Sequence, residues 1–164
     1  VPLIVMAETA RGVAAVEAIA TASPNVSAIF FGAIDYAADI GCAVEWDAVL
    51  FARSRVVLAA AIANVSPIDS PFMDVPDLAV LADECSRTQA LGFVGKAAIH
   101  PTQVSTIQQA FTPAAVDVAW AKRIVEAYET NNGGVLLVDG KLIERPVIAS
   151  AKRTLAIAST VGDV

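Results

Sequence analysis

Short apolar runs in this chain alternate with longer segments in which apolar residues recur at helical spacing. The apolar runs predict buried strands at residues 3–7, 26–31, 65–69 and 96–99. The segments between and after them predict helices at residues 9–21, 46–64, 74–91 and 103–110, with a short helical turn before Gly41. Apolar strands that alternate with helices are typical of a parallel sheet, so the pattern predicts an α/β fold.

The last third of the chain has a different pattern. It predicts a helix at residues 113–130, a break at residues 131–134, and a β-hairpin with strands at 135–138 and 141–143. Asp139-Gly140 suits the type I′ turn of such a hairpin, and Pro146 opens a last helix to about residue 159. We therefore expect two parts, residues 1–112 and 113–164.

The spacing of the predicted strands indicates a particular α/β architecture. The strands begin about 25–35 residues apart, which is the size of one βα unit in a (β/α)8 barrel. A complete TIM barrel takes about 250 residues, whereas this chain has 164. We therefore expect about half of a (β/α)8 barrel, followed by a helix-hairpin-helix extension.

Composition narrows the function classes. Hydrophobic residues make up 56% of the chain and charged residues 17%, which excludes a disordered tail. The formal net charge of −6 argues against nucleic acid and against an anionic membrane surface as partners. The longest apolar stretch, residues 56–63, is far shorter than a membrane span. With two cysteines in no metal-binding spacing and no signal peptide, we expect a cytoplasmic protein.

Acidic residues follow three of the four predicted strands. Glu8, Asp35 and Asp69 stand at or just after the ends of the first three strands. Parallel strands end at one edge of the sheet, where chemistry gathers in such folds. Glu8 and Asp35 belong to neighbouring units, so their carboxylates could converge on a hard cation such as Mg²⁺. The alternative is that each acid caps the helix that follows it.

Other residues near the same edge are open to two interpretations. The turn Gly32-Ala33-Ile34 could bind a carboxylate through its backbone N–H groups or be an ordinary tight turn. Arg11 could reach the same edge or be a helix surface charge, and Asp69 could line a pocket or act as a cap. His100, the one histidine, could contact a ligand, although a structural role at a strand end is the better interpretation.

Several motifs together resemble a known family. They are residues 6–12 (MAETARG), 31–36 (FGAIDY), 50–55 (LFARSR), 95–101 (GKAAIHP) and 139–148 (DGKLIERPVI). In this order they are similar to the citrate lyase beta subunit-like proteins of the HpcH/HpaI aldolase superfamily. That group includes citryl-, citramalyl- and malyl-CoA lyases.

The resemblance implies a fold and a chemistry. The fold would be a (β/α)8 barrel that binds Mg²⁺, with Mn²⁺ as a substitute, and cleaves a 3-hydroxyacyl-CoA thioester by a retro-Claisen reaction. Glu8 and Asp35 match the family's metal ligands. Backbone N–H groups near Gly32, Ala33 and Ile34 would hold the substrate carboxylate or the 2-oxoacid product, and Asp69 is a further candidate for substrate binding.

The resemblance also implies an oligomer, a trimer or hexamer of the full-length protein. In the family, the C-terminal segment of one subunit covers the site of its neighbour. Its acid, usually Asp, corresponds to Glu144 here, one methylene longer. Glu144 and Arg11 are thus the candidates for catalytic residues.

The family's first four βα units, which carry an arginine and much of the CoA site, have no counterpart here. Because the chain also starts in a predicted strand, we expect a C-terminal half that is inactive alone. Two other functions stay open: a class II pyruvate-type aldolase that uses no CoA, and a half-barrel subunit without catalytic activity. The sequence does not choose among the acyl-CoA substrates.

Overall fold

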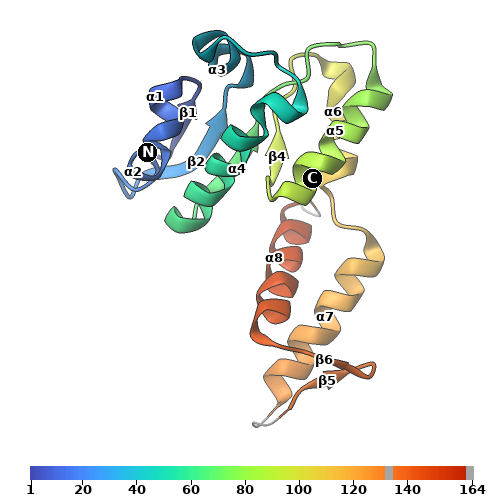
Figure 1. Cartoon of the computed structure of the whole chain (residues 1–164). Helices are drawn as coiled ribbons and strands as arrows, with labels where there is room; N and C mark the ends of the chain where they lie inside the picture. The colour runs from blue at the N-terminus through green and yellow to red at the C-terminus, as the bar shows by residue number, and fades with distance from the viewer. Residues whose placement is uncertain (132–134, 162–164) are drawn as a thin grey trace. The chain divides into compact units, whose positions relative to one another are not determined.

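The computed structural model describes residues 1–131 and 135–161. The chain divides into two compact units, Val1–Phe111 and Thr112–Val164, and each is described by itself. The first unit contains a four-stranded parallel sheet in the order β1-β2-β3-β4 (Figure 1), which confirms the predicted α/β fold with a parallel sheet. Its strands are β1 (Leu3–Ala7), β2 (Val26–Phe31), β3 (Ser66–Asp69) and β4 (Gly95–Lys96).

Six helices belong to the first unit: α1 (Ala10–Ala14), α2 (Val16–Ala20), α3 (Ala33–Ile40), α4 (Trp46–Ala63), α5 (Leu78–Leu91) and α6 (Pro101–Phe111). The single helix expected at residues 9–21 is wrong, because the backbone leaves the helical region at Ala15, with φ −99° and ψ 9°. The helix expected from residue 74 begins later, where the Asp77 side chain accepts a hydrogen bond from the Val80 N–H. None of the described helices is long and apolar enough to cross a membrane.

One face of the sheet packs against helices. Paired residues of neighbouring parallel strands share a face, and Ala7 is paired with Phe31. Both are buried, together with Ile29 on β2 and with Val49 and Val56 on α4. Burial of each such large apolar side chain contributes about 1.5–3 kcal/mol. This cluster is the core of the first unit, and it explains why the apolar positions of α4 recur at helical spacing.

The opposite face of the sheet is less covered in the described part of the chain. Ile4 and Met6 of β1 point to this side and are 64% and 54% exposed. Their neighbours Phe30 on β2 and Ile68 on β3 are partly buried. The sheet of this unit therefore has one fully buried face and one face on which apolar side chains meet solvent.

The second unit is a helical pair with a small hairpin: α7 (Ala115–Thr130), β5 (Leu137–Val138), β6 (Lys141–Leu142) and α8 (Arg145–Val161). Helices α7 and α8 pack side by side (Figure 1), around a core that includes Ile124, Val138 and Ile148. Positive φ angles at Asp139 (50°) and Gly140 (74°) confirm the predicted type I′ turn. Of the break expected at residues 131–134, residues 132–134 lie outside the described residues.

We predict that Gly140→Ala destabilises the second unit by about 1 kcal/mol, because an L side chain rarely adopts its positive φ. Gly95→Ala is the matched control, since an added Cβ would meet open space at both positions but only Gly140 has a left-handed backbone. Urea unfolding followed by the fluorescence of Trp120 and Trp46 reports on the two units. Equal small changes for the two variants would contradict the prediction.

Candidate active site

The edge at which β1 and β2 end brings two of the candidate segments into contact. Ala7 and Phe31 are paired, so Glu8 and Gly32 follow side by side, and the Gly32 N–H donates to the Ala7 carbonyl at 3.1 Å. A Cβ on Gly32 would lie 2.5 Å from the Glu8 Cβ and 3.1 Å from its Oε2. Glycine at this position is therefore what leaves room for the half-buried Glu8 side chain.

The same glycine starts helix α3. Gly32 is the N-cap and has no side chain that could accept from the first-turn N–H groups of Ala33, Ile34 and Asp35. Asp35 lies in this first turn and is exposed. The positive end of a helix favours anions, so the turn that holds Glu8 also presents backbone donors suited to a carboxylate.

A side chain that the sequence analysis did not consider connects this turn to the loop after β1. The Asp39 Oδ2 of α3 accepts a hydrogen bond from the Ala10 N–H at 2.7 Å. Thr9 caps α1, with its Oγ1 accepting from the Gly12 N–H at 3.0 Å. Asp39 lies four residues after Asp35, on the same side of α3, which is the signal that could have identified it. Arg11 lies on α1 and is exposed.

The oxygen donors at this edge fit a hard cation. Mg²⁺ is commonly held by one or two carboxylates and keeps water or substrate oxygens in its other positions. Glu8 lies half-buried against the turn, and Asp35 stands exposed in the first turn of α3. These two carboxylates could hold such a cation, with water or substrate oxygens in its other positions. No group of three or more His, Cys, Asp or Glu side chains gathers among residues 1–131 and 135–161.

Asp69 lies in a different environment, on the helix-covered side of the sheet. It is fully buried, and both of its carboxylate oxygens accept hydrogen bonds from protein groups. Oδ1 accepts from the Arg53 Nε at 3.0 Å, and Oδ2 accepts from the Lys96 Nζ at 2.7 Å and the Thr88 Oγ1 at 3.3 Å. Its carboxylate therefore stabilises charges inside the unit.

Glu84 on α5 completes this buried charge cluster. Its Oε1 accepts from the Lys96 Nζ at 2.6 Å and from the Arg53 Nη2 at 3.3 Å. Arg53 also stacks on Trp46, with its guanidinium carbon 4.6 Å from the ring centroid. Its spacing of four residues from buried Val49 is the signal that it lies on the buried face of α4.

The cluster also affects the thiol of Cys85 on α5. Burial raises the pKa of the Cys85 thiol, an effect that Lys96 partly opposes. The thiol therefore stays protonated at neutral pH, and the thiol is a poor nucleophile. His100 is exposed, and its Nδ1 contacts the Thr102 Oγ1 at 2.9 Å at the start of α6.

Glu144 belongs to the second unit, whereas Glu8, Gly32 and Asp35 belong to the first. Its side chain is exposed. Its carbonyl accepts from the Val147 and Ile148 N–H groups at 3.0 and 3.2 Å, which places it at the start of α8. Within the first unit, the structure thus brings Glu8 together with the turn at residues 32–35, and holds Asp69 in a separate, buried charge cluster.

Comparison with known protein families shows the family to which this chain belongs. Residues 1–101 match the family described as HpcH/HpaI aldolase/citrate lyase. The chain belongs to that family. This confirms the resemblance drawn from the five sequence motifs.

Among its relatives, the L-malyl-CoA/beta-methylmalyl-CoA lyase of Rhodobacter capsulatus is 33% identical, over 93% of this chain and 55% of its own length. The mitochondrial citramalyl-CoA lyase of Homo sapiens is 29% identical, over 97% of this chain and 51% of its own length. This chain therefore spans about half the length of these relatives.

Solved structures are similar over nearly the whole chain. CitE of Mycobacterium tuberculosis in complex with magnesium, acetoacetate and coenzyme A is 28% identical, with a TM-score of 0.78 over 96% of this chain and 61% of its own. A citrate lyase from Burkholderia xenovorans shares the fold with a TM-score of 0.82 at 24% identity, over 99% of this chain and 54% of its own.

We predict that Asp69→Asn destabilises the first unit by about 3–5 kcal/mol, because it leaves the buried Arg53 and Lys96 with one carboxylate for two positive charges. Asp47→Asn is the control, since the Asp47 side chain is 95% exposed and its ion pair, from Oδ1 to the Arg87 Nη2, is long at 3.9 Å. It should not change stability measurably. Urea unfolding by circular dichroism measures both. A small effect of Asp69→Asn would show that the cluster does not stabilise the fold.

Proposed function

We propose that this chain supplies the metal-binding half of a Mg²⁺-dependent carbon–carbon lyase. The substrate would be a 3-hydroxyacyl-CoA of the citryl-, citramalyl- or malyl-CoA type. The products would be an acyl-CoA and a 2-oxoacid or related carboxylate. The complete fold would be a (β/α)8 barrel, of which the parallel sheet described above is about half.

One observation carries this proposal: Glu8 lies directly against the turn that opens α3, and Asp35 stands in the first turn of that helix. This places a carboxylate pair and a set of backbone N–H donors at a single edge of the sheet. A substrate with adjacent hydroxyl and carboxylate groups needs both. The relatives whose names state a CoA-ester lyase activity make the same chemistry the best candidate here.

In this proposal each residue near the carboxyl edge of the sheet has a separate role. The carboxylates of Glu8 and Asp35 hold Mg²⁺, which when bound supplies Lewis-acid polarisation of substrate oxygens. The N–H groups of Ala33 and Ile34 orient the substrate carboxylate. Asp69 positions Arg53 and Lys96 and does not contact the substrate, because its oxygens already accept from Arg53, Lys96 and Thr88.

Cleavage requires a proton to leave the substrate hydroxyl as the adjacent carbon–carbon bond breaks. The hydroxyl carbon becomes the carbonyl of the 2-oxoacid, and the electron pair passes to the acyl-CoA fragment as an enolate, which then takes up a proton. Arg11, exposed three residues after Glu8, is proposed to stabilise developing negative charge. Glu144, exposed at the start of α8, is proposed to exchange the proton in the site of a neighbouring subunit of a trimer or hexamer.

We predict that Glu8→Gln and Asp35→Asn each abolish Mg²⁺ binding measured by isothermal calorimetry, because each removes one of two charged ligands. Glu45→Gln and Asp47→Asn are matched controls, since both acids are exposed on the same unit near the start of α4. Retained affinity in the first two variants, or loss in the controls, would show that the metal site is elsewhere.

A second titration tests the reaction class. We expect the Mg²⁺-loaded chain to bind acetyl-CoA only weakly, because the units that carry much of the family's CoA site have no counterpart here. We expect it to show no cleavage of citramalyl-CoA or malyl-CoA alone, because it spans about half of its relatives. Binding of pyruvate without CoA would favour the aldolase alternative. Binding of neither would favour a subunit without catalytic activity, and cleavage by the chain alone would refute the expectation that it is inactive.

A further inference from the structure

A pocket lies beside the buried charge cluster, within the first unit. It has a volume of about 460 Å³, which is in the range of small-molecule sites. Its walls are largely apolar and come from the loop after β3 and from the segments around α3: Ile34, Val44, Phe72 and Met73. Of the residues assigned to the proposed lyase site, it includes only Ile34.

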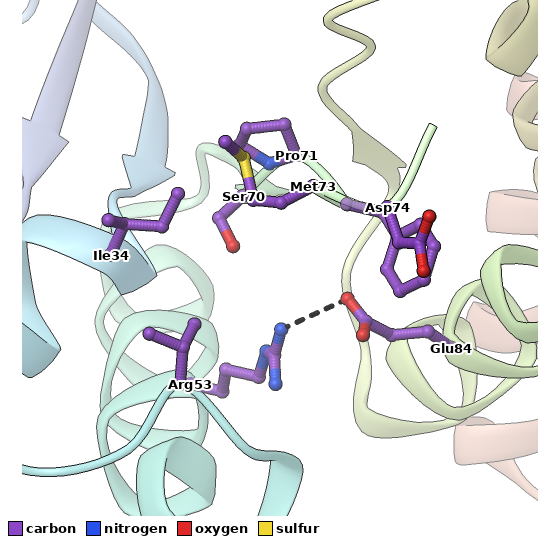
Figure 2. A pocket seen from close by; sticks show the side chains of 9 residues that line it. Ile34, Arg53, Ser70, Pro71, Met73, Asp74 and Glu84 are labelled. Atoms are coloured by element: carbon purple, nitrogen blue, oxygen red, sulfur yellow. Dashed lines mark hydrogen bonds and ion pairs between the residues drawn. The ribbon is translucent and has the colours of Figure 1, made fainter. Parts of the chain in front are cut away.

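A buried hydroxyl without a partner points into this pocket. Ser70 is only 3% exposed, and its side chain forms no hydrogen bond with any residue that the structure describes. Among the described residues, every side-chain polar atom that is sealed from solvent has a partner. The Ser70 Oγ is therefore reachable, and Figure 2 shows it directed into the hollow that it lines.

Charged atoms of the buried cluster form another wall of the pocket. Arg53 is 3% exposed and uses its Nε and Nη2 toward Asp69 and Glu84, and no hydrogen bond is formed by its Nη1 within the described residues. Glu84 uses Oε1 toward Arg53 and Lys96, and its Oε2 likewise has no partner there. Neither atom is sealed from solvent. Figure 2 shows the Arg53 and Glu84 side chains joined by an ion pair at the pocket wall. A donor residue and an acceptor residue thus line the same pocket as the unpaired Ser70 hydroxyl.

The charge balance excludes an anion. Arg53 and Lys96 are matched by Asp69 and Glu84, so the cluster is neutral, and exposed Asp74 at the pocket adds one negative charge. An anionic ligand would meet no net positive field. A purely apolar ligand would leave the Ser70 hydroxyl unsatisfied, which is costly for a buried polar group.

We propose that this pocket binds a neutral carboxamide on a short apolar group. The amide oxygen accepts from Arg53 and Ser70, the amide N–H donates to Glu84, and the alkyl parts contact the apolar walls. Each polar atom left over by the cluster then has a partner. This proposal does not depend on the lyase function, and it is tested without Mg²⁺ or CoA thioesters.

Three probes of equal size separate the possibilities: N-ethylpropanamide, ethyl propanoate and pentanoate. The ester lacks only the N–H donor, and pentanoate carries the charge that the pocket should reject. Methyl chemical shifts of Met73 and Ile34 in the labelled chain report binding. We expect the amide to bind at about millimolar concentration. The ester and pentanoate should each bind at least about five-fold more weakly, because the ester loses one hydrogen bond and pentanoate buries a charge.

Ser70→Ala should weaken amide binding about five-fold. Ser105→Ala is the control, because Ser105 is exposed on α6 and does not line the pocket. The probe series in the unchanged chain needs no variant to fold. Equal shifts with all three probes, tighter binding of pentanoate, no shift with the amide, or no effect of Ser70→Ala would each overturn the proposal.

Discussion

The neutral cluster of Asp69, Arg53, Lys96 and Glu84 is the interaction on which the first unit depends. It joins four consecutive elements of the chain, α4, β3, α5 and β4, through side chains that are 12 to 31 residues apart. Removing four charges from water costs several kcal/mol per ion, and only close pairing with further hydrogen bonds offsets this. Here each carboxylate accepts from both cations, so no charge is left alone. The cluster thereby fixes the end of β3, where the next loop begins.

Strand register explains why Asp69 and Glu8, two acids at the ends of strands, differ in their surroundings. Side chains alternate between the faces of a strand, and Asp69 lies two residues after Pro67, which pairs with core residue Ile29. Asp69 therefore points to the helices, where it contacts Arg53 of α4. Glu8 lies two residues after exposed Met6 and belongs to the opposite side, where Gly32 makes room for it. Asp69 and Glu8 thus differ by one position in the sheet register. Asp69 is a structural carboxylate, whereas Glu8 stays available to a ligand.

The sequence could predict those strands and turns that depend on the local pattern of residues. The first two strands occur at the predicted residues, and Asp139-Gly140 adopts the turn that its backbone preference favours. It could not predict the partners of Asp69, because Arg53, Thr88 and Lys96 are 16 to 27 residues away and meet only through the sheet register. It also placed β4 at residues 96–99, whereas the strand is Gly95–Lys96. The last ladder bond of that segment is the Ala97 N–H to the Asp69 carbonyl at 3.0 Å, after which the chain turns into α6.

The uncovered face of the sheet bears directly on the chemistry of Glu8. Ile4, Met6 and Glu8 follow one another on the same side of β1, and the first two meet solvent in this chain. Charges in contact with water are screened, whereas the same charges beside buried apolar groups interact several-fold more strongly. Any structure that packs on Ile4 and Met6 would therefore strengthen the proposed binding of a cation by Glu8 and Asp35, and would exclude water from the proposed site. The residues proposed to bind metal lie within this chain, but their full electrostatic effect depends on a cover over this face.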